Sequence, residues 1–476
     1  MRLDQVKALA VGALGFFCCM PYVALPVGAR TALQVGSILS LALAAPSIYF
    51  CRRRDFWLAL VLSVPLLVSA LKVGVVEDDL ELAIKSVVTM ILCFTTVIAA
   101  TAWTPKYANA MQTGIAMAIV LHVVVGAVQI YSFSIGQFPL ESFYNNPSFL
   151  SVQDNADTIA RYIQRPFGLF PEPSAMSSSL APWALFWLAE GFGLVRLREQ
   201  PASWQRLLFR CAAVSALGLI IVSRSGHAAV TLAAAGLFVV LWFSRCRATA
   251  RTYWVLVAIV AVALPMVIYF AADALGDRLR GKSELGNSSW EDRFNSLSFG
   301  LRLLVDRDFA TLIFGVGPGL TSPILQRIVR MEAVWSVLLT YVYETGVIGA
   351  IAVTIVAQHL ARAWKQVRYS IAFAAIAIVW LVGITVTTSY VELLPLWLTL
   401  GWLAIWPTIC APVQVAGGGR RSVGRNLSHK PLKQSETTRS NYPRNWKLKV
   451  IDLTTQSEQP ASAQKAPAIH RRWSHK

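Results

Sequence analysis

The sequence predicts an all-α polytopic membrane protein, and three observations support this fold class. Of the 476 residues, 55% are hydrophobic and only 14% are charged, whereas soluble domains carry about 25% charged residues. Apolar runs of about 20 residues, the length that crosses a hydrocarbon core as a helix, recur from residue 8 to residue 411. Charged residues separate these runs. Helices are expected within them because a helix satisfies its own backbone hydrogen bonds in lipid.

The apolar runs predict about twelve transmembrane helices within a domain of residues 1–411. Their expected bounds are 8–27, 32–50, 56–75, 85–103, 109–131, 175–195, 207–224, 226–243, 252–272, 335–358, 369–389 and 391–411. The separation of 207–224 from 226–243 depends on Ser223-Arg224-Ser225-Gly226, a short polar sequence with a glycine inside a long apolar run.

Basic residues in the short loops predict the orientation, because cytoplasmic loops carry an excess of Lys and Arg. With Met1 in the cytoplasm, the inside loops carry Arg52-Arg53-Arg54, Lys106, Arg196, Arg198, Arg206, Arg245, Arg247, Arg251, Arg362, Lys365 and Arg368. The short outside loops carry Arg30, Arg224 and the acidic stretch Glu77-Asp78-Asp79. Both termini are therefore expected in the cytoplasm, and two long loops, at about 132–174 and 273–334, are expected outside.

The second long loop combines an apolar stripe with several arginines. Its residues Phe294, Leu297, Leu301 and Leu304 recur at helical spacing, which predicts an amphipathic helix on the membrane face. The loop contains Arg278, Arg280, Arg293, Arg302, Arg307, Arg327 and Arg330. This charge requires a negatively charged partner. The nearby sequence "FGVGPG" lacks the lysine of a phosphate-binding loop, and a flexible turn is expected there.

The C-terminal residues 412–476 differ from the rest of the chain. From Arg420 onward there are 13 Lys or Arg against Glu436, Asp452 and Glu458. The segment is also rich in Ser, Thr, Gln and Pro, so it is expected to be disordered. Its positive charge suits the anionic cytoplasmic leaflet. Nucleic acid is not an expected partner, because no aromatic-basic module accompanies the charge.

A few ionisable residues beside apolar runs are the candidates for chemistry. Arg165 and Glu172 flank "PFGLFP", where the alternative is a salt bridge that stiffens a proline turn. Arg224 and His227 lie between two predicted helices. The alternatives to a functional role are that Arg224 extends its charge to the membrane interface and that His227 is a packed polar residue. Glu344 lies within an apolar run, and a buried carboxylate must be paired, protonated or in contact with water.

These candidates share a position toward the outer face of the predicted membrane domain. Arginine side chains bind phosphate oxygens in bidentate fashion, so Arg165, Arg224 and Arg293 suit an anionic lipid headgroup. Their positive charges would stabilise the negative charge that develops on a diphosphate leaving group, without a metal. The sequence shows no carboxylate cluster of a metal-binding type, and no metal or other cofactor is expected.

Four stretches, in order, resemble the O-antigen ligase/polymerase superfamily, which includes bacterial exopolysaccharide polymerases. They are "RPFGLFPEPSAMSSSLAP", "SRSGHAAVTLAAAG", "SWEDRFNSLSFGLRLL" with "FGVGPG", and "LLTYVYETGVIGAI", which cover residues 165 to about 350. The resemblance implies a multi-pass glycosyltransferase of the bacterial inner membrane. Such proteins join oligosaccharide repeat units carried on undecaprenyl diphosphate at the periplasmic face, without a metal.

The resemblance also implies roles for individual residues. By motif position, Arg165 corresponds to the arginine before the G-x-F-x-E-P-S element, and Arg224 to the arginine of the R-S-G element. Arg293 corresponds to the arginine that opens the loop helix. These arginines would bind the diphosphate. Glu344 corresponds to the glutamate of the E-x-G-x-x-G element.

One departure from the family bears on the activity. Ligase-type relatives often have His-Asn upstream of that glutamate, where this sequence has Trp335-Ser336. This difference favours a polymerase over a ligase. It also leaves the general base open among Glu344, Glu172 and His227, in that order.

Two alternatives remain beside the polymerase. One is a ligase that transfers glycan to a lipid or protein acceptor. The other is a transporter without catalytic chemistry, whose signature is a repeated pair of broken helices with an ionisable site at the midplane. The sequence shows neither a clear two-half symmetry nor such a charge pair. For the polymerase, the expected partners are undecaprenyl-diphosphate-linked oligosaccharide, membrane lipids, and a flippase, chain-length regulator or export protein.

Overall fold

The chain divides into two units, Met1–Val415 and Ala416–Lys476. The computed structural model describes residues 3–28, 31–49, 53–76, 80–140, 144, 146, 165–245, 298–299, 302, 308–329, 334, 336–368, 370–387 and 390–411. The predicted helix 252–272, the candidate Arg293 and the tail 412–476 lie outside these residues. The fold described below is that of the first unit.

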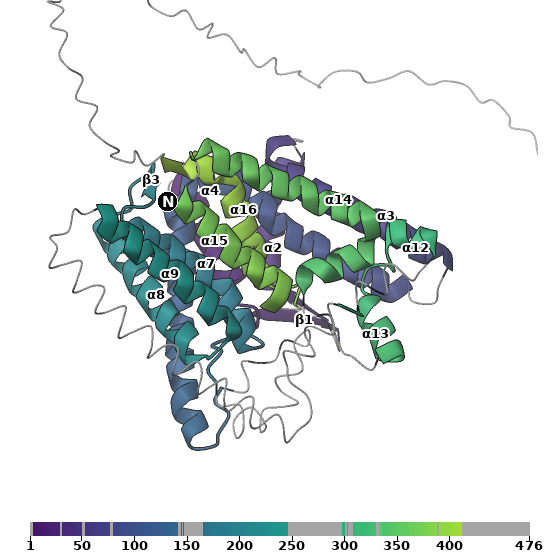
Figure 1. Ribbon diagram of the computed structural model, residues 1–476, viewed down its shortest axis with the longest axis horizontal. Coiled ribbons are helices and arrows are strands. Elements are labelled where there is room, and N and C mark those ends of the chain that lie inside the picture. The colour runs from purple at the N-terminus through teal and green to yellow at the C-terminus, as the bar shows by residue number, and fades with distance from the viewer. Residues whose placement is uncertain are drawn as a thin grey trace, which may run out of the picture. The chain divides into compact units, whose positions relative to one another are not determined.

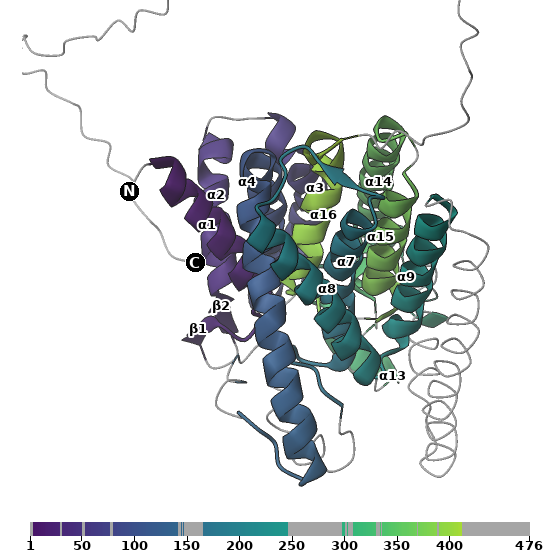
Figure 2. The same ribbon diagram turned by 90° about the vertical axis from the view of Figure 1, so that its left-hand side faces the viewer.

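Twelve α-helices account for most of the described residues (Figures 1 and 2). They are α1 (Leu3–Cys18), α2 (Val35–Tyr49), α3 (Arg53–Val76), α4 (Leu80–Ser134), α7 (Pro173–Gly191), α8 (Ser203–Val222), α9 (Gly226–Arg245), α12 (Phe309–Phe314), α13 (Thr321–Val329), α14 (Val337–Gln366), α15 (Ile371–Val382) and α16 (Leu394–Ile409). A π-helical turn, η4 (Gly383–Thr387), continues α15. The predicted helical fold class is confirmed for this part of the chain.

Four helices are long and apolar enough to cross a membrane. They are Phe56–Val73, Leu80–Ser134, Ser203–Val222 and Val337–Gln366. Shorter apolar helices are Val35–Tyr49, Gly226–Trp242, Ile371–Thr385 and Leu394–Ile409. This set is typical of a multi-pass membrane protein, whereas the number of twelve spans remains a prediction.

Two of the predicted helices join into one long element. Residues 85–103 and 109–131 both belong to α4, whose two halves meet at a kink at Tyr107 (φ −127°, ψ 34°). Pro105 lies inside the helix just before this kink. A proline removes a backbone donor and clashes with the preceding turn, which accounts for the break.

Other predicted bounds differ in both directions. The helix predicted at 8–27 ends at Cys18, and the end of that range lies in a β-strand, Ala24–Gly28. The break at Ser223-Arg224-Ser225 between α8 and α9 is confirmed. In contrast, α14 continues past its expected end at residue 358 to Gln366. The second long loop contains α12 and α13, two helices that the sequence did not predict.

Helix α7 lies at the centre of the packing. It contacts α8, α9, α15 and α16, and Ser174 through Trp187 are all buried. The ring of Trp183 meets that of Trp402 on α16 edge-on at 5.1 Å, and Trp187 stacks on Phe209 of α8 at 5.4 Å. Because α7 is packed between these four helices, its N-terminal residues are held in place.

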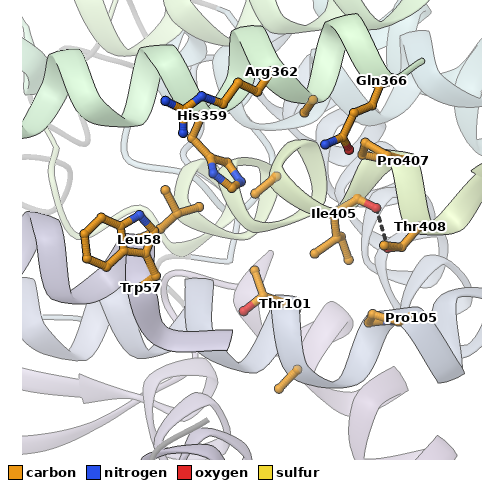
Figure 3. A pocket seen from close by; sticks show the side chains of 13 residues that line it. Trp57, Leu58, Thr101, Pro105, His359, Arg362, Gln366, Ile405, Pro407 and Thr408 are labelled. Carbon is orange, nitrogen blue, oxygen red and sulfur yellow. Dashed lines mark hydrogen bonds between the residues drawn. The ribbon is translucent and has the colours of Figure 1, made fainter. Parts of the chain in front are cut away.

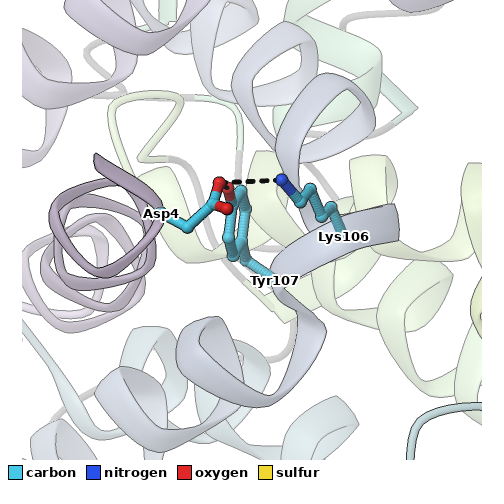
Figure 4. Close-up of polar contacts among 3 residues, drawn as sticks. All are labelled: Asp4, Lys106 and Tyr107. Carbon is cyan, nitrogen blue, oxygen red and sulfur yellow. Dashed lines mark hydrogen bonds and ion pairs between the residues drawn. The ribbon is translucent and has the colours of Figure 1, made fainter. Parts of the chain in front are cut away.

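Small residues allow the closest helix crossing. A Cβ atom at Gly114 of α4 would lie 1.9 Å from the carbonyl oxygen of Gly12 on α1. Only glycine fits there, so the backbones of α1 and α4 approach in the manner common for membrane helices. The N-terminal end of α1 is also tied to the kink of α4, because Lys106 Nζ and Tyr107 Oη both lie against Asp4 Oδ1, at 2.9 and 3.0 Å (Figure 4).

Two short antiparallel ribbons complete this unit. Strands β1 (Ala24–Gly28) and β2 (Thr31–Gln34) form the hairpin between α1 and α2. Strands β3 (Arg196–Leu197) and β4 (Cys410–Ala411) pair the loop after α7 with the end of α16. The ribbons therefore fix connections at helix ends and leave the spanning part of the bundle helical.

Candidate functional site

Glu344 lies at a break in α14. The carboxyl-bearing residue is only 6% exposed. Two residues later, Gly346 has φ 65° and ψ −152°, a conformation open almost only to glycine, and it interrupts the helix. Such a break frees backbone groups that must find other partners when they are buried at membrane depth.

The glycine loop between α12 and α13 supplies those partners. The amide of Val316 donates to the Tyr343 carbonyl at 3.1 Å, and the amide of Gly317 donates to the Glu344 carbonyl at 3.2 Å. Ser69 of α3 donates its hydroxyl to the same Glu344 carbonyl at 2.6 Å. The carbonyls of Tyr343 and Glu344, next to the break, are therefore both bonded.

Lys72 of α3 fastens the loop from the other side. Its ammonium group donates to the Gly315 carbonyl at 2.9 Å and to the Thr311 hydroxyl at 2.8 Å. A Cβ atom at Gly315 would lie 2.2 Å from the Glu344 carbonyl oxygen, and one at Gly346 would lie 2.5 Å from the Gly315 nitrogen. The "FGVGPG" sequence thus links α12 to α13 as expected, but the expectation of a flexible turn is wrong, because the loop is packed against α14.

The Glu344 carboxylate is bonded to the start of α13. Thr321 donates its hydroxyl to Glu344 Oε1 at 3.1 Å, and the backbone of Gly319 and of Thr321 also bonds this carboxylate. A negative charge is favourable at a helix N-terminus. The carboxylate therefore has a structural role in holding α13, in addition to any role in chemistry.

A pocket of about 280 Å³ lies beside Glu344. It is lined by Leu82, Lys85, Ser86, Thr89, Gly319, Thr321, Ser322, Val334, Thr340, Glu344, Val391 and Glu392. Glu392 and Glu344 are near enough to interact as like charges, and Lys85 offsets the charge of Glu392. We call this the carboxylate pocket.

Three side chains hold the backbone that carries Glu392. Gln34 of β2 donates to the Glu392 carbonyl at 3.0 Å. Trp397 and Cys93 donate to the carbonyl of Val391, at 2.8 and 3.6 Å. The carboxylate pocket is thus formed by rigid connections between helices, as a site that must place polar groups accurately requires.

Arg165 and Glu172 lie on the segment that leads into α7. Arg165 is half-buried and contacts other residues. The Glu172 carboxylate accepts a hydrogen bond from the hydroxyl of Ser174. Between them, the amides of Phe167 and Gly168 both donate to Gln129 Oε1 at 2.9 Å. The segment is therefore fixed to α4.

Arg224 and His227 lie at the turn between α8 and α9. Arg224 is exposed and has φ 49°. Next to it, the Ser223 hydroxyl lies 3.4 Å from that of Ser177 on α7. His227 is fully buried, and neither ring nitrogen has a hydrogen-bond partner among the described residues. A Cβ atom at Gly383 of η4 would lie 3.6 Å from its ring.

The structure therefore separates the candidate residues into two groups. Glu172, Arg224 and His227 gather around the first turns of α7, whereas Glu344 lies in the carboxylate pocket. The connection from η4 to α16 joins the groups, because η4 packs on α7, α9 and α14 and the same connection supplies Glu392. Arg293 lies outside the described residues.

Several residues of these groups escaped the sequence reasoning. Lys85 lines the pocket, and His122 and Gln129 of α4 bond the backbone of residues 167–169. The signal for the last two was present, since both are polar residues inside an apolar run, seven positions apart. Lys72 carried the same signal, as a charged residue inside the predicted helix 56–75, whereas no comparable signal marks Ser69.

The comparisons with known proteins add no assignment. Neither the known protein-family models nor the curated protein sequences contain a match to this chain. Within the described ranges, no group of three or more His, Cys, Asp or Glu side chains is arranged to hold a metal ion.

Proposed function

We propose that this protein is a membrane glycosyltransferase that polymerises undecaprenyl-diphosphate-linked oligosaccharide repeat units at the periplasmic face of the bacterial inner membrane. The observation that carries the proposal is the position of Glu344. Its carboxylate is buried at a helix break, is held by Thr321, and lines a pocket with Glu392 and Lys85. Buried ionisable groups in membrane helices are costly and tend to be functional.

The reaction would exchange one glycosidic bond for another. A sugar hydroxyl of one lipid-linked unit forms a bond to the anomeric carbon of a second unit, and the bond from that carbon to the diphosphate breaks. The electron pair leaves with undecaprenyl diphosphate, and the hydroxyl proton passes to a Glu344 carboxylate oxygen. A positioned base of this kind contributes typically 10²–10⁴-fold to the rate.

Arginines would neutralise the leaving diphosphate. Arg165 and Arg224 flank the polar first turns of α7, and Arg293 belongs to the same proposed set. Their planar guanidinium groups bind phosphate oxygens in pairs, and they would act where negative charge develops. The fixed backbone between Phe167 and Leu169 supports this role, because it would hold Arg165 in one position.

Glu344 is the proposed base in preference to the other two candidates. Glu172 is bonded to its neighbour Ser174 on the same turn. The ring nitrogens of His227 have no hydrogen-bond partner among the described residues, but the side chain is fully buried and a substrate could not reach it. Glu344 lines a pocket that a substrate could enter.

The test is an assay of the purified full chain with lipid-diphosphate-linked repeat units. Polymer is the expected product, whereas transfer to another acceptor would show a ligase. Arg165→Ala and Arg224→Ala should each abolish polymer and leave single lipid-linked repeats, and Arg224→Lys should restore it only in part. The matched control is Arg206→Ala, an exposed arginine in the first turn of α8. Wild-type polymer length in both alanine variants would overturn the arginine assignment.

A transporter is the second candidate, and one observation favours it. Broken helices with nearby ionisable groups form the binding sites of many transporters, and α14 is broken two residues after Glu344. The same preparation in proteoliposomes distinguishes the two functions. Accumulation of a labelled glycolipid headgroup inside the vesicles without any new glycosidic bond would establish transport and refute the polymerase.

A further inference from the structure

A second pocket lies further along α4 and α14, two helices that also line the carboxylate pocket. It has a volume of about 620 Å³, which is the size of a small-ligand site. Helices α3, α4, α14 and α16 line it with Trp57, Leu58, Thr101, Ala102, Pro105, His359, Arg362, Ala363, Gln366, Ala404, Ile405, Pro407 and Thr408 (Figure 3). We call it the arginine pocket.

The position along α14 places this pocket near a membrane surface. His359 follows the break at Gly346 by 13 residues, about 20 Å along a helix, and Gln366 follows it by 20 residues, about 30 Å. The hydrocarbon core is about 30 Å thick. If the break lies near one surface, as its polar surroundings indicate, the arginine pocket lies at the level of the headgroups of the opposite leaflet.

The pocket presents positive charge without a matching acid. None of its lining residues is acidic. His359, Arg362 and Gln366 lie on one face of α14, at spacings of three and four residues. The guanidinium group of Arg362 forms no hydrogen bond or ion pair with a described residue. An unpaired arginine beside a histidine favours an anion from outside the chain.

The opposite side of the pocket is apolar. Figure 3 shows Trp57 and Leu58 of α3 across from His359, and Ile405 of α16 on the side of Thr408. Trp57 remains 36% exposed on a helix that is long and apolar enough to span a membrane. Tryptophan is typical of the boundary between headgroups and acyl chains. The pocket therefore offers a cationic end and an apolar end.

We propose that the arginine pocket binds the phosphate headgroup of an anionic membrane lipid, with Arg362 and His359 at the phosphate and Trp57 against the start of the acyl chain. Basic pockets between membrane helices are known to bind such headgroups. Two threonine hydroxyls of the lining are already bonded, Thr408 to the Ile405 carbonyl at 2.6 Å and Thr101 to the carbonyls of Val97 and Ile98 at 3.0 Å. Gln366 is therefore the neutral polar side chain of the lining that would contact the headgroup. This site lies apart from the carboxylate pocket, and it does not depend on the proposed polymerase.

The test measures lipid binding to the purified full chain by native mass spectrometry. Phosphatidylglycerol should bind more tightly than phosphatidylcholine, and Arg362→Gln should weaken it roughly fivefold, the effect of one basic residue at a membrane surface. Lys365→Gln is the matched control, because Lys365 is an exposed cation in the same last turn of α14 but does not line the pocket. His359→Gln gives a second reading if Arg362→Gln is poorly folded.

Further arms identify the source of the phosphate. Trp57→Ala should lower the affinity for phosphatidylglycerol, and millimolar inorganic phosphate should not displace the lipid. The contrary result is displacement of the lipid by inorganic phosphate, with an affinity that depends on Arg362 and not on Trp57. That result would assign the pocket to a soluble phosphate compound and overturn the proposal of a lipid ligand. Equal loss in the Arg362 and Lys365 variants, or no loss in either, would overturn the site itself.

Discussion

The two pockets share two helices, α4 and α14, but their charged groups are compensated in different ways. In the carboxylate pocket, Glu344 is bonded by Thr321, and Lys85 offsets Glu392. In the arginine pocket, Arg362 has no ion-pair partner among the described residues. The first pocket uses the protein's own hydrogen bonds to hold a charge in place. The second leaves a charge available to a ligand.

This difference follows from the surroundings of each charge. A carboxylate that is 6% exposed must be bonded within the protein, because burial of an unpaired charge is very costly. Arg362 is exposed at the end of its helix, where water or a lipid headgroup can compensate it at little cost. Glu344, which is bonded within the protein, should therefore affect the reaction rate and the stability of the fold. Arg362, which is not, should affect ligand binding. The predictions that follow test this contrast.

The largest effect is expected for Glu344→Gln. Glutamine keeps an oxygen that accepts from Thr321 but cannot take a proton, so the fold should persist while polymer formation falls about 10²–10⁴-fold. Polymer yield and thermal unfolding, measured on the same preparation, separate the two effects. If unfolding shifts strongly and the surviving protein keeps its full activity, Glu344 serves only to hold α13. Lys365→Gln, which also removes one charge on α14, should change neither quantity.

A smaller effect, on stability, is expected for Gly315→Ala. Its backbone (φ 79°, ψ −179°) suits almost only glycine, and the new Cβ would meet the Glu344 carbonyl at 2.2 Å. We expect the free energy of unfolding to fall by about 1–3 kcal/mol. The control is Gly218→Ala in α8, where no atom lies within 4 Å of the added Cβ. Equal unfolding temperatures for the two variants would show that the glycine loop does not brace the break.

The smallest effect is expected at the exposed ion pair that joins α1 to α4 near the arginine pocket. The hydrogen bond from Lys106 lowers the pKa of Asp4 below its ordinary value. Because the folded state holds this proton less tightly than the unfolded state, the stabilisation is present at neutral pH. It is lost as pH falls below about 3.9, the ordinary value, and through the lowered one.

Asp4→Asn should therefore lower the unfolding temperature slightly at pH 7, and the difference from wild type should shrink in acid and in high salt. The control is Glu199→Gln, an exposed acid after α7 with no ion pair among the residues described. A difference that grows on acidification would contradict the sign of the pKa shift. A large difference at neutral pH would contradict the surface character of the pair.

The sequence was informative wherever the signal is local. Apolar length predicted α3, α8, α9 and α16 within a few residues, because a span is defined by its own composition. The polar break after Val222 was visible for the same reason. By contrast, α12 and α13 were missed, because at 6 and 9 residues they are too short to show a clear helical periodicity.

The candidate site was only partly predictable. Glu344 stands out as a lone acid in an apolar run, and Arg224 and His227 interrupt another. Their grouping was not visible, because Glu344 shares its pocket with Lys85 and Glu392 rather than with the other candidates. Nothing in the stretch 85–103 indicated that Lys85 would share a pocket with Glu392, on the connection that leads into α16.

By itself, then, the sequence determined a helical chain with several membrane-crossing runs, a few isolated charges in them, and a glycine-rich loop. Only the tertiary structure decided what those features do. Ser69 bonds Glu344 across 275 positions and Lys72 bonds Gly315 across 243, and contacts of that separation leave no periodic trace in a single sequence. The break in α14 is stable because those distant groups satisfy its carbonyls, so the position of Glu344 is a property of the packed bundle.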